Sequence, residues 1–530
     1  MTGWMQHLMI APIILPLLVG AVMVLAGERR RSLVTGLAIA STTTLVVLSI
    51  LLLLRAAGAE ESSTQVYRLA NWPAQFGIVL VLDRLSALML VLSSVLGLCA
   101  LTFALARWHK AGAHFHPLFQ FQLMGLNGAF LTGDLFNLFV FFEVMLAASY
   151  GLVLHGSGTA RVRAGLHYIA INLAASLLFL VGVSMLYGLV GTLNMADLAT
   201  RIPALPAEDR GLVEAGAAIL GIAFLIKAGM WPMGFWLPTT YAAASAPAAA
   251  ILSILSKVGV YAVLRIWLLL FGEGAGDSAG FGGTWLVVGG LLTIAFGSIA
   301  VLATQNTARL AGGAVLVSSG TLLAAIGVGQ VGVTGGALFY LASSVPGIAA
   351  FFLLIELAER GRDVGADVLA VTREAFGEAE EEDMEEEEVG VAIPATKAVL
   401  GMSFFACALL LAGLPPLSGF LAKFAMLAPL LSPEGETGVL RWLLSAALLM
   451  SGLATIISMT RAGIDAFWVT PEGNLPRIGL LEFAPVLLLL GLCLAMTVAA
   501  GPVLQYMQAT ADALHLPSAY LRGVMGALAP

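Results

Sequence analysis

Charged residues and cysteine are scarce in this sequence. Asp, Glu, Lys and Arg make up 11% of the 530 residues, and cysteine occurs three times. Soluble globular domains carry about 25% charged residues, so this composition, with 59% hydrophobic residues and a mean hydropathy of +0.96, excludes a soluble protein. The cysteines form no CxxC pair, which indicates neither a disulfide framework nor a metal centre. Nothing in the charge pattern favours nucleic-acid binding.

Long apolar stretches account for most of the chain. A spanning helix needs about 20 apolar residues, because lipid offers the backbone no hydrogen-bond partner and a helix satisfies its own groups. The alternating segments of about 10 residues that are typical of barrel strands do not occur. The sequence therefore predicts an all-α polytopic membrane protein with about fourteen transmembrane helices. The windows are roughly 8–26, 33–54, 80–105, 117–133, 134–154, 165–190, 212–231, 243–269, 284–304, 308–329, 334–358, 396–430, 439–460 and 479–500.

Basic residues mark one side of the membrane. Cytoplasmic loops are enriched in Lys and Arg, so we expect a multi-pass protein of the cell's inner (plasma) membrane with both termini outside. The segment 67–81 is predicted to form an external hairpin or an interfacial piece. The basic connections contain Arg29, Arg30, Arg31, Arg107, Lys110, Arg161, Arg163, Arg461 and Arg477, and the opposite ones contain Glu60, Glu61, Glu208, Asp209, Glu273, Asp277, Glu434 and Glu436.

Two apolar windows contain residues that interrupt a helix. These are 225–238, which contains Pro232, and 412–423, which contains Pro415. Proline lacks a backbone donor and clashes with the preceding turn, so each window should hold a discontinuous helix. At membrane depth such backbone persists only where protein buries it or a water-filled cavity reaches it. A pair of interrupted spans in corresponding halves is typical of transporters built from repeats.

Lysine is rare, and its positions are unusual. Of the 25 basic residues five are lysine, and three of these, Lys227, Lys257 and Lys423, fall inside apolar windows. Arginine keeps its proton in proteins, whereas a buried lysine can release it. A proton carrier must be charged in one state and neutral in the next. The choice of lysine therefore favours a proton path.

One acidic residue accompanies these lysines inside the membrane. Glu143 lies nine residues after Asp134, which at ~1.5 Å per residue places it about 14 Å into its span. A charge at a helix centre costs ~2.5 to 3.5 kcal/mol, so we expect Glu143 and Lys227 to pair. Each charge alone also fits a structural ion pair.

Two further ionisable residues lie in the apolar windows. His167 is predicted to be either a relay between charged sites or a structural residue. Arg265 is predicted to snorkel to the outer face.

One long polar connection, 359–394, is strongly acidic. Seven glutamates and one aspartate lie between positions 380 and 388. Such a block repels itself and is usually a solvated loop; a docking or cation-attracting role is the alternative.

The sequence contains no P-loop, and the pair His114 and His116 lacks a third ligand. We therefore expect neither a cofactor nor a metal.

In combination, these motifs resemble a known family. The chain is similar to the antiporter-like membrane subunits of respiratory complex I, and within that superfamily it most resembles the D subunit of Mrp-type multisubunit Na⁺/H⁺ antiporters. The resemblance rests on 71–73, 83–86, 141–145 around Glu143, 227–238 with Lys227, 246–261 with Lys257, and 411–423 with Lys423.

The resemblance implies two inverted five-helix repeats, each with a discontinuous helix. The domains would be 1–110 (three N-terminal helices), 111–270 (first repeat), 271–462 (second repeat, with the acidic loop) and 463–530 (last helix and tail). It implies a line of charges in which Glu143 and Lys227 form the proton site, Lys257 links the repeats and Lys423 ends the line. The supporting positions are His167, Asp134, Ser318, Ser343, Pro232 and Pro415.

The sequence departs from the family pattern in the second half. Family members commonly carry His or Lys where this chain has Ser343, and a more polar run around Ser318. We expect the link from Lys257 to Lys423 to depend on serines and water.

Three functions are compatible with this sequence. The first is a proton-translocating subunit that works with the other Mrp subunits in the lipid bilayer, exchanges H⁺ for Na⁺ or a similar cation, and is not an enzyme. The second is a proton-pumping membrane subunit of a complex I-like NADH:quinone oxidoreductase or a membrane-bound hydrogenase. The third is a structural scaffold whose charges are vestigial.

Overall fold

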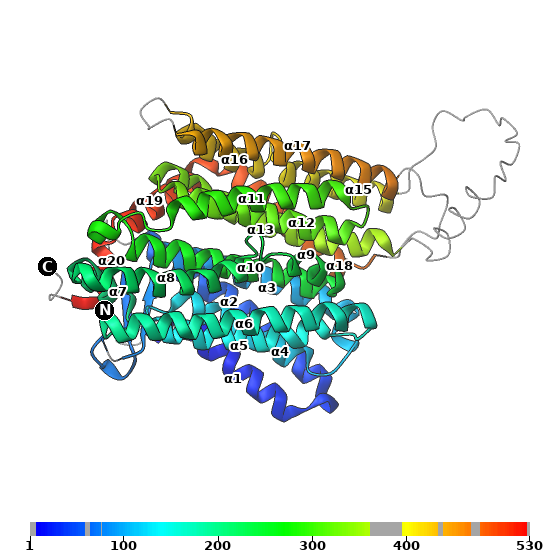
Figure 1. The fold of residues 1–530 in the computed structure, drawn as a ribbon. Helices are drawn as coiled ribbons and strands as arrows, with labels where there is room; N and C mark the ends of the chain where they lie inside the picture. The colour runs from blue at the N-terminus through cyan, green and yellow to red at the C-terminus, as the bar shows by residue number, and fades with distance from the viewer. Residues whose placement is uncertain are drawn as a thin grey trace, which may run out of the picture.

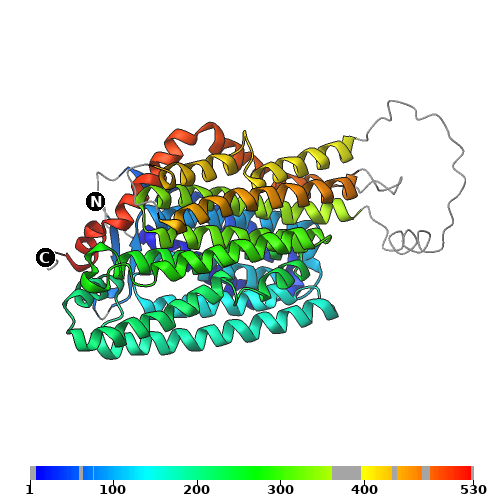
Figure 2. The same ribbon diagram turned by 45° about the horizontal axis from the view of Figure 1, so that its top comes forward.

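Most of the described residues are helical. The computed structural model describes residues 7–58, 64–75, 77–360, 395–432, 438–467 and 478–526, and the long helices lie roughly parallel in both ribbon views (Figures 1 and 2). In chain order the elements are α1 Ala11–Ala26, α2 Arg31–Ala57, β1 Gln65–Arg68, β2 Val79–Leu82, α3 Arg84–Ala106, η4 Trp108–Lys110, α4 Phe115–Leu131, α5 Leu135–Leu154, α6 Thr159–Val190, α7 Met195–Arg201, α8 Ala207–Ala228, α9 Trp236–Ala243, α10 Ala246–Leu270, η6 Glu273–Ser278, α11 Gly283–Ala303, α12 Thr307–Val328, α13 Val331–Glu359, α15 Ala395–Ala412, α16 Ser418–Leu430, α17 Val439–Phe467, α18 Leu480–Val498, α19 Ala500–His515 and α20 Ser518–Met525.

The helices match the predicted windows. In the described part of the chain, twelve are long and apolar enough to cross a membrane. With α1 and α4, which have 16 and 17 residues, all fourteen predicted windows are helical. The prediction of an all-α polytopic membrane protein is confirmed. Which end faces the cytoplasm stays a prediction.

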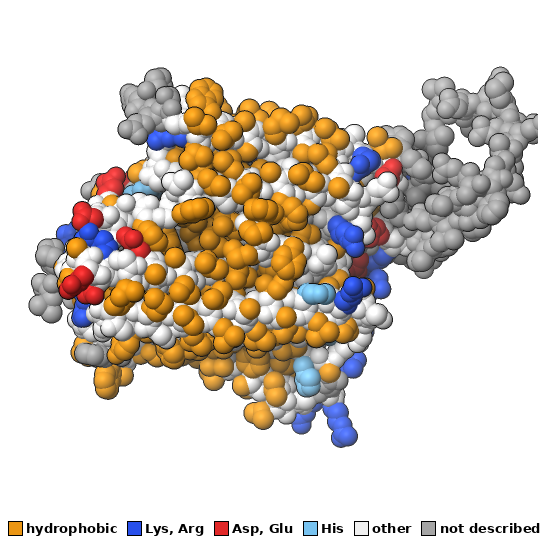
Figure 3. All heavy atoms as spheres, viewed as in Figure 1, with side chains coloured by type: hydrophobic (Ala, Val, Ile, Leu, Met, Phe, Trp, Pro, Cys, Tyr) orange, Lys and Arg blue, Asp and Glu red, His pale blue; other side chains and the backbone are white. Residues whose placement is uncertain are grey.

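The surface has the character of a membrane protein. Hydrophobic side chains cover the middle of the face seen in Figure 3, and charged side chains gather toward its two ends. Large apolar residues such as Leu25, Trp285 and Val498 are more than three-quarters exposed. An apolar band of this kind is stable in lipid, where a soluble protein would bury it.

Both predicted helix breaks are present. α8 ends at Ala228, and Gly229 follows with φ 78°; α15 ends at Ala412, and Gly413 follows with φ 73°. Glycine adopts this left-handed conformation without strain and so ends each helix. The Trp231–Pro232 and Pro415–Pro416 peptide bonds are cis. The chain resumes as α9 and α16.

The helices around the two breaks pack in a corresponding order. In one half α4 packs on α5, α6 on α8, and α8 on α10; in the other α11 packs on α12, α13 on α15, and α15 on α17. This order supports the two repeats, and their limits stay predictions. α17 continues to Phe467, so a domain boundary at residue 462 would fall inside a helix.

A β-hairpin closes one end of the molecule. β1 and β2 pair antiparallel, which is the hairpin alternative for 67–81; that it faces the outside stays a prediction. His7 hydrogen-bonds the Tyr67 hydroxyl at 2.9 Å, and Arg68 donates to the carbonyl of Val524 in α20 at 2.8 Å. The start of the described chain and α20 therefore lie at the same end, as an even number of crossings requires. α19 and α20 were not predicted from the sequence.

Some of the charged residues used to predict the loops lie outside the described residues. They are the acidic run between 380 and 388 and the residues Glu60, Glu61, Glu434, Glu436 and Arg477.

Candidate functional site

Lys227 occupies the last turn of α8, where the first break begins. Its side chain is 5% exposed, and Nζ has no hydrogen-bond partner among the described residues. Nζ lies 5.3 Å from the centre of the Phe142 ring, within the range of a cation–π contact. A cavity of about 10 Å³, lined also by Asn172 and Trp236, adjoins Lys227 and is large enough for about one water molecule. A buried ammonium with no hydrogen-bond acceptor in the described part of the chain is suited to releasing its proton.

Glu143 lies on α5, next to Phe142 in sequence, and is half-buried. Its carboxylate accepts a hydrogen bond from Ser176 of α6. Because Nζ of Lys227 has no hydrogen-bond partner among the described residues, the expected direct pair with Glu143 is not formed. The charge of Glu143 still acts on Lys227, and α5 touches α8 through the Phe142 and Phe224 rings. Glu143 is thus the sequence neighbour of the aromatic residue whose ring contacts Lys227.

Lys257 lies in the centre of the molecule. It is fully buried in α10, and Nζ donates to Ser319 Oγ at 2.9 Å and to the Val315 carbonyl at 3.3 Å, both on α12. A methyl group added to Gly259 would approach the backbone nitrogen of Ala228 to 2.6 Å. The glycine therefore lets α8 and α10 pack backbone to backbone, which brings the region of Lys227 against the helix of Lys257.

Lys423 lies beside the second break. It is 6% exposed on α16, and Nζ donates to the Ala412 carbonyl at 2.9 Å and to the Leu448 carbonyl of α17 at 3.3 Å. Ala412 is the last residue of α15, where carbonyls have no partner within the helix. The lysine thus supplies a hydrogen-bond donor to the C-terminal end of α15 at the break.

Hydroxyl groups continue the line from Lys257. Ser319 accepts a hydrogen bond from Lys257, and the adjacent Ser318 shares a hydrogen bond of 3.0 Å with Ser344 of α13. All three serines are buried. Ser318 was predicted as a supporting residue; Ser319 and Ser344 were missed, although adjacent serines in an apolar window were a usable signal.

A second serine pair leads on to α16. Ser343, the neighbour of Ser344, shares a hydrogen bond of 2.7 Å with Ser418, the first residue of α16. Ser343, Ser344 and Tyr340 also line a cavity of about 10 Å³, again enough for about one water. Ser418 precedes Lys423 by five residues on α16. The structure therefore places hydroxyl groups between Lys257 and Lys423, where the sequence predicted that serines would stand.

The four remaining residues predicted to support the proton path do not contact the buried lysines in any hydrogen bond described above. Asp134 caps α5 by accepting from the Asn137 N–H at 2.9 Å. His167 is exposed on α6 and its Nδ1 donates to the Arg163 carbonyl at 3.0 Å, so it does not lie among the buried charges. Pro232 and Pro415 lie in the two breaks.

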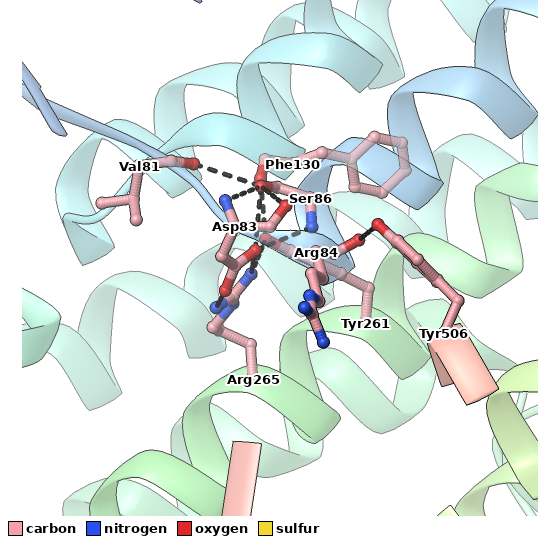
Figure 4. Close-up of polar contacts among 8 residues, drawn as sticks. All are labelled: Val81, Asp83, Arg84, Ser86, Phe130, Tyr261, Arg265 and Tyr506. Carbon is pink, nitrogen blue, oxygen red and sulfur yellow. Dashed lines mark hydrogen bonds and ion pairs between the residues drawn. The ribbon is translucent and has the colours of Figure 1, made fainter. Parts of the chain in front are cut away.

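The prediction that Arg265 snorkels is wrong. Its side chain is 6% exposed and forms a two-point ion pair with Asp83, the N-cap of α3, with Nη2 to Oδ1 at 2.8 Å (Figure 4). Burial raises the pKa of the Asp83 carboxyl, but the charge and hydrogen bonds of Arg265 outweigh this and hold the pKa below its usual value. The sequence offered no signal for the pairing, because the partners are 182 positions apart.

A metal site is not evident in the described residues. None of them form a group of three or more His, Cys, Asp or Glu side chains arranged to hold an ion.

Comparison with known proteins decides the family. Residues 132–449 match the family described as "NADH:quinone oxidoreductase/Mrp antiporter, TM". A protein of Rhizobium meliloti named as the D subunit of a probable K⁺/H⁺ antiporter is 60% identical to this chain over 99% of both proteins. The chain belongs to the family of Mrp-type antiporter D subunits. A more distant relative, the D subunit of an Na⁺/H⁺ antiporter from Alkalihalophilus pseudofirmus, is 34% identical over 98% of this chain and 100% of the relative.

A solved structure agrees with this membership in the D-subunit family. A chain in the "Structure of Mrp complex from Dietzia sp. DQ12-45-1b" superposes with a TM-score of 0.84 and 26% identity, over 99% of this chain and 100% of that one. The family assignment made from the Glu143, Lys227, Lys257 and Lys423 motifs is thereby confirmed. The roles of these four residues stay predictions.

Proposed function

We propose that this chain is a proton-translocating subunit of a multisubunit monovalent cation/H⁺ antiporter. The observation that carries the proposal is a row of four ionisable side chains, Glu143 on α5, Lys227 on α8, Lys257 on α10 and Lys423 on α16. The three lysines are almost fully buried. Ionisable groups at membrane depth are costly and mark ion or proton pathways. The chain would carry no cofactor and perform no bond-making chemistry beyond proton transfer.

K⁺ is the better candidate for the exchanged cation than the Na⁺ first expected. The relative at 60% identity is named for K⁺, and the one at 34% for Na⁺. Both relatives are named as one subunit of an antiporter, and the solved neighbour is a complex. We therefore propose that the chain works with other Mrp subunits in the plasma membrane.

Proton transfer in the first half would begin at Glu143. The Ser176 hydroxyl donates a hydrogen bond to its carboxylate. A proton taken up by Glu143 removes the negative charge nearest Lys227 and thereby promotes loss of the lysine proton. The cavity beside Lys227 has room for about one water to carry that proton toward α10.

Transfer in the second half would use hydroxyl groups. Lys257 donates to Ser319, and a serine can accept one proton while it donates another. The pairs Ser318–Ser344 and Ser343–Ser418 shorten the remaining gap to Lys423. Water in the adjoining cavity would bridge successive pairs.

A proton-pumping subunit of a redox complex, the alternative function, would use the same proton path. The family description includes NADH:quinone oxidoreductase subunits, and the same charges would serve a proton pump driven by partner proteins. Cation-dependent exchange by the assembly, in the absence of any electron donor, distinguishes antiport from redox pumping.

Lys227→Ala tests the proposed function. We measure the collapse of a pH gradient by added K⁺ or Na⁺ in everted vesicles from an antiporter-deficient host that expresses the complete assembly. The unmodified chain should give cation-dependent collapse without an electron donor. We expect Lys227→Ala to slow it about tenfold, or ~1.4 kcal/mol, because water filling the enlarged cavity carries part of the proton flow.

Lys110→Ala is the matched control, since Lys110 is an exposed lysine in η4. Its exchange rate should equal that of the unmodified chain. Unchanged exchange by Lys227→Ala in normally assembled complexes would contradict the proposed role of Lys227.

Ser343→Ala tests the hydroxyl chain of the second half. The variant removes the hydrogen bond to Ser418 but adds no charge and changes the volume little. We expect exchange to slow about three- to tenfold, at most ~1.4 kcal/mol. Ser403→Ala is the control, because Ser403 bonds the carbonyl of Val399 in its own helix. Equal rates for both variants would exclude Ser343 from the path.

A further inference from the structure

A polar cavity of about 430 Å³ lies at the end of the molecule that carries the hairpin. Its walls come from the start of α3 and from α19 and α20, and include Arg84, Thr510, Asp512 and Arg522. A cavity of this size with charged walls holds many water molecules. The cavity is separate from the row that begins at Glu143.

The Asp83–Arg265 ion pair lies where this cavity meets the protein interior. Asp83 lines the cavity and its side chain is 19% exposed, whereas that of Arg265 is 6% exposed. Ser86, in the first turn of α3, also binds Asp83: its N–H and its hydroxyl both donate to Oδ1 at 2.9 Å (Figure 4). The carboxylate therefore faces water, and the guanidinium lies behind it.

Arg265 shares a face of α10 with Lys257. Lys257, Tyr261 and Arg265 recur at every fourth position, so they lie along one side of the helix. Arg265 Nη2 lies 3.4 Å from the Tyr261 hydroxyl, which donates to the Phe130 carbonyl at 2.8 Å (Figure 4). At 1.5 Å per residue, Arg265 is about 12 Å from Lys257 along the axis. The ion pair is thus placed between the cavity and the central lysine.

We propose that the Asp83–Arg265 pair is an electrostatic gate between this cavity and Lys257. Arg265 keeps its charge in a protein, and a fixed positive charge in a pore excludes cations and protons. Asp83 balances that charge, so it sets how strongly Arg265 opposes a proton that moves to or from Lys257. The inference rests on the proposed function, because it takes Lys257 as a proton carrier.

Three variants of the Asp83–Arg265 pair distinguish a gating role from a purely structural role. In Asp83→Asn the charge of Arg265 is unbalanced. The unbalanced positive charge opposes a proton that moves to Lys257, so we expect exchange to fall about tenfold. In the double variant Asp83→Asn/Arg265→Gln the opposing charge is gone. We expect proton movement to return, now partly as a collapse of the pH gradient that needs no added cation.

Arg265→Gln alone should show the same cation-independent leak. Asp277→Asn is the control, because it breaks an ion pair with Arg210 at the surface, outside the cavity lining, and it should behave like the unmodified chain. A purely structural pair predicts a different pattern: the double variant recovers relative to Asp83→Asn because no unpaired charge stays buried, but no variant leaks without added cation. That pattern would overturn the gate.

Thiol labelling tests whether water reaches the gate. The three native cysteines are buried. Thr510→Cys places a thiol at a buried position that lines the cavity, and Thr42→Cys places one at a buried position on α2; both threonines bond a carbonyl of their own helix. A membrane-impermeant thiol reagent should modify only the former, from outside intact cells. Absence of labelling at Thr510→Cys from either side of the membrane would overturn the proposal.

Glu143→Gln in the same assay separates the two proposals. If it abolishes exchange while the pair variants leave exchange unchanged, the gate is wrong and the proposed function stands. If Glu143→Gln leaves exchange intact, the proposed function is wrong, and the gate, which rests on it, is wrong as well.

Discussion

Glu143→Gln should reduce cation-dependent exchange to background, a fall of about 100-fold or more, or ~2.7 kcal/mol. Glutamine has nearly the same shape and still accepts the hydrogen bond from Ser176, but an amide does not take up and release a proton at neutral pH. Glu143 is the one carboxylate in the proposed row, so no lysine replaces its function. The effect should therefore exceed that of Lys227→Ala, whose place water can partly take.

The measurement is the cation-dependent collapse of a pH gradient in everted vesicles, with the amount of assembled complex determined in the same membranes. Glu208→Gln serves as the control, since Glu208 is exposed in the first turn of α8. A substantial exchange rate in fully assembled Glu143→Gln complexes would refute a proton path through Glu143. Loss of assembly in this variant, but not in Glu208→Gln, would assign Glu143 a structural role.

Lys257→Met should have an effect of similar size, because Lys257 connects the two halves of the row. Methionine fills a similar volume in the centre of α10 but neither carries a proton nor donates to Ser319. We expect exchange to fall about 100-fold, or ~2.7 kcal/mol. Removing a buried charge relieves a desolvation cost of several kcal/mol, which offsets the ~1 to 3 kcal/mol of leaving Ser319 and the Val315 carbonyl without a donor. Assembly should therefore be retained.

Lys397→Met is the matched control, because Lys397 lies in the first turn of α15 and is half-exposed. Normal exchange in this control together with loss in Lys257→Met locates the effect at the centre of α10. Exchange retained by Lys257→Met would mean that protons cross within one half of the molecule and that no connection through Lys257 is needed.

Local chemistry made much of this molecule predictable. Hydropathy over about 20 residues marks a span, and all fourteen windows became helices. Glycine and proline chemistry predicted both breaks, because the backbone restraints of these residues act within a few positions. The burial of Lys227, Lys257 and Lys423 followed from their place inside apolar windows.

Contacts between distant segments were decided only by the tertiary structure. The sequence predicted that Glu143 and Lys227 pair, but the packing of α5 against α8 puts the Phe142 ring next to Lys227. His167 is polar in an apolar window, yet the rotation of α6 within the bundle turns it outward. Arg265 near a helix end looked free to reach the surface, and only the approach of α3 gives it Asp83 as a buried partner.

The sequence by itself therefore determined which segments cross the membrane, where two of them break and which charges they carry inside. Each of these depends on residues within one helix, where a few neighbouring side chains and the backbone decide the free energy. The partners of those charges, namely Ser176, Ser319, Ser344, Ser418 and Asp83, depended on which face each helix turns to its neighbours. That orientation results from packing all the helices together, and no single window contains the information.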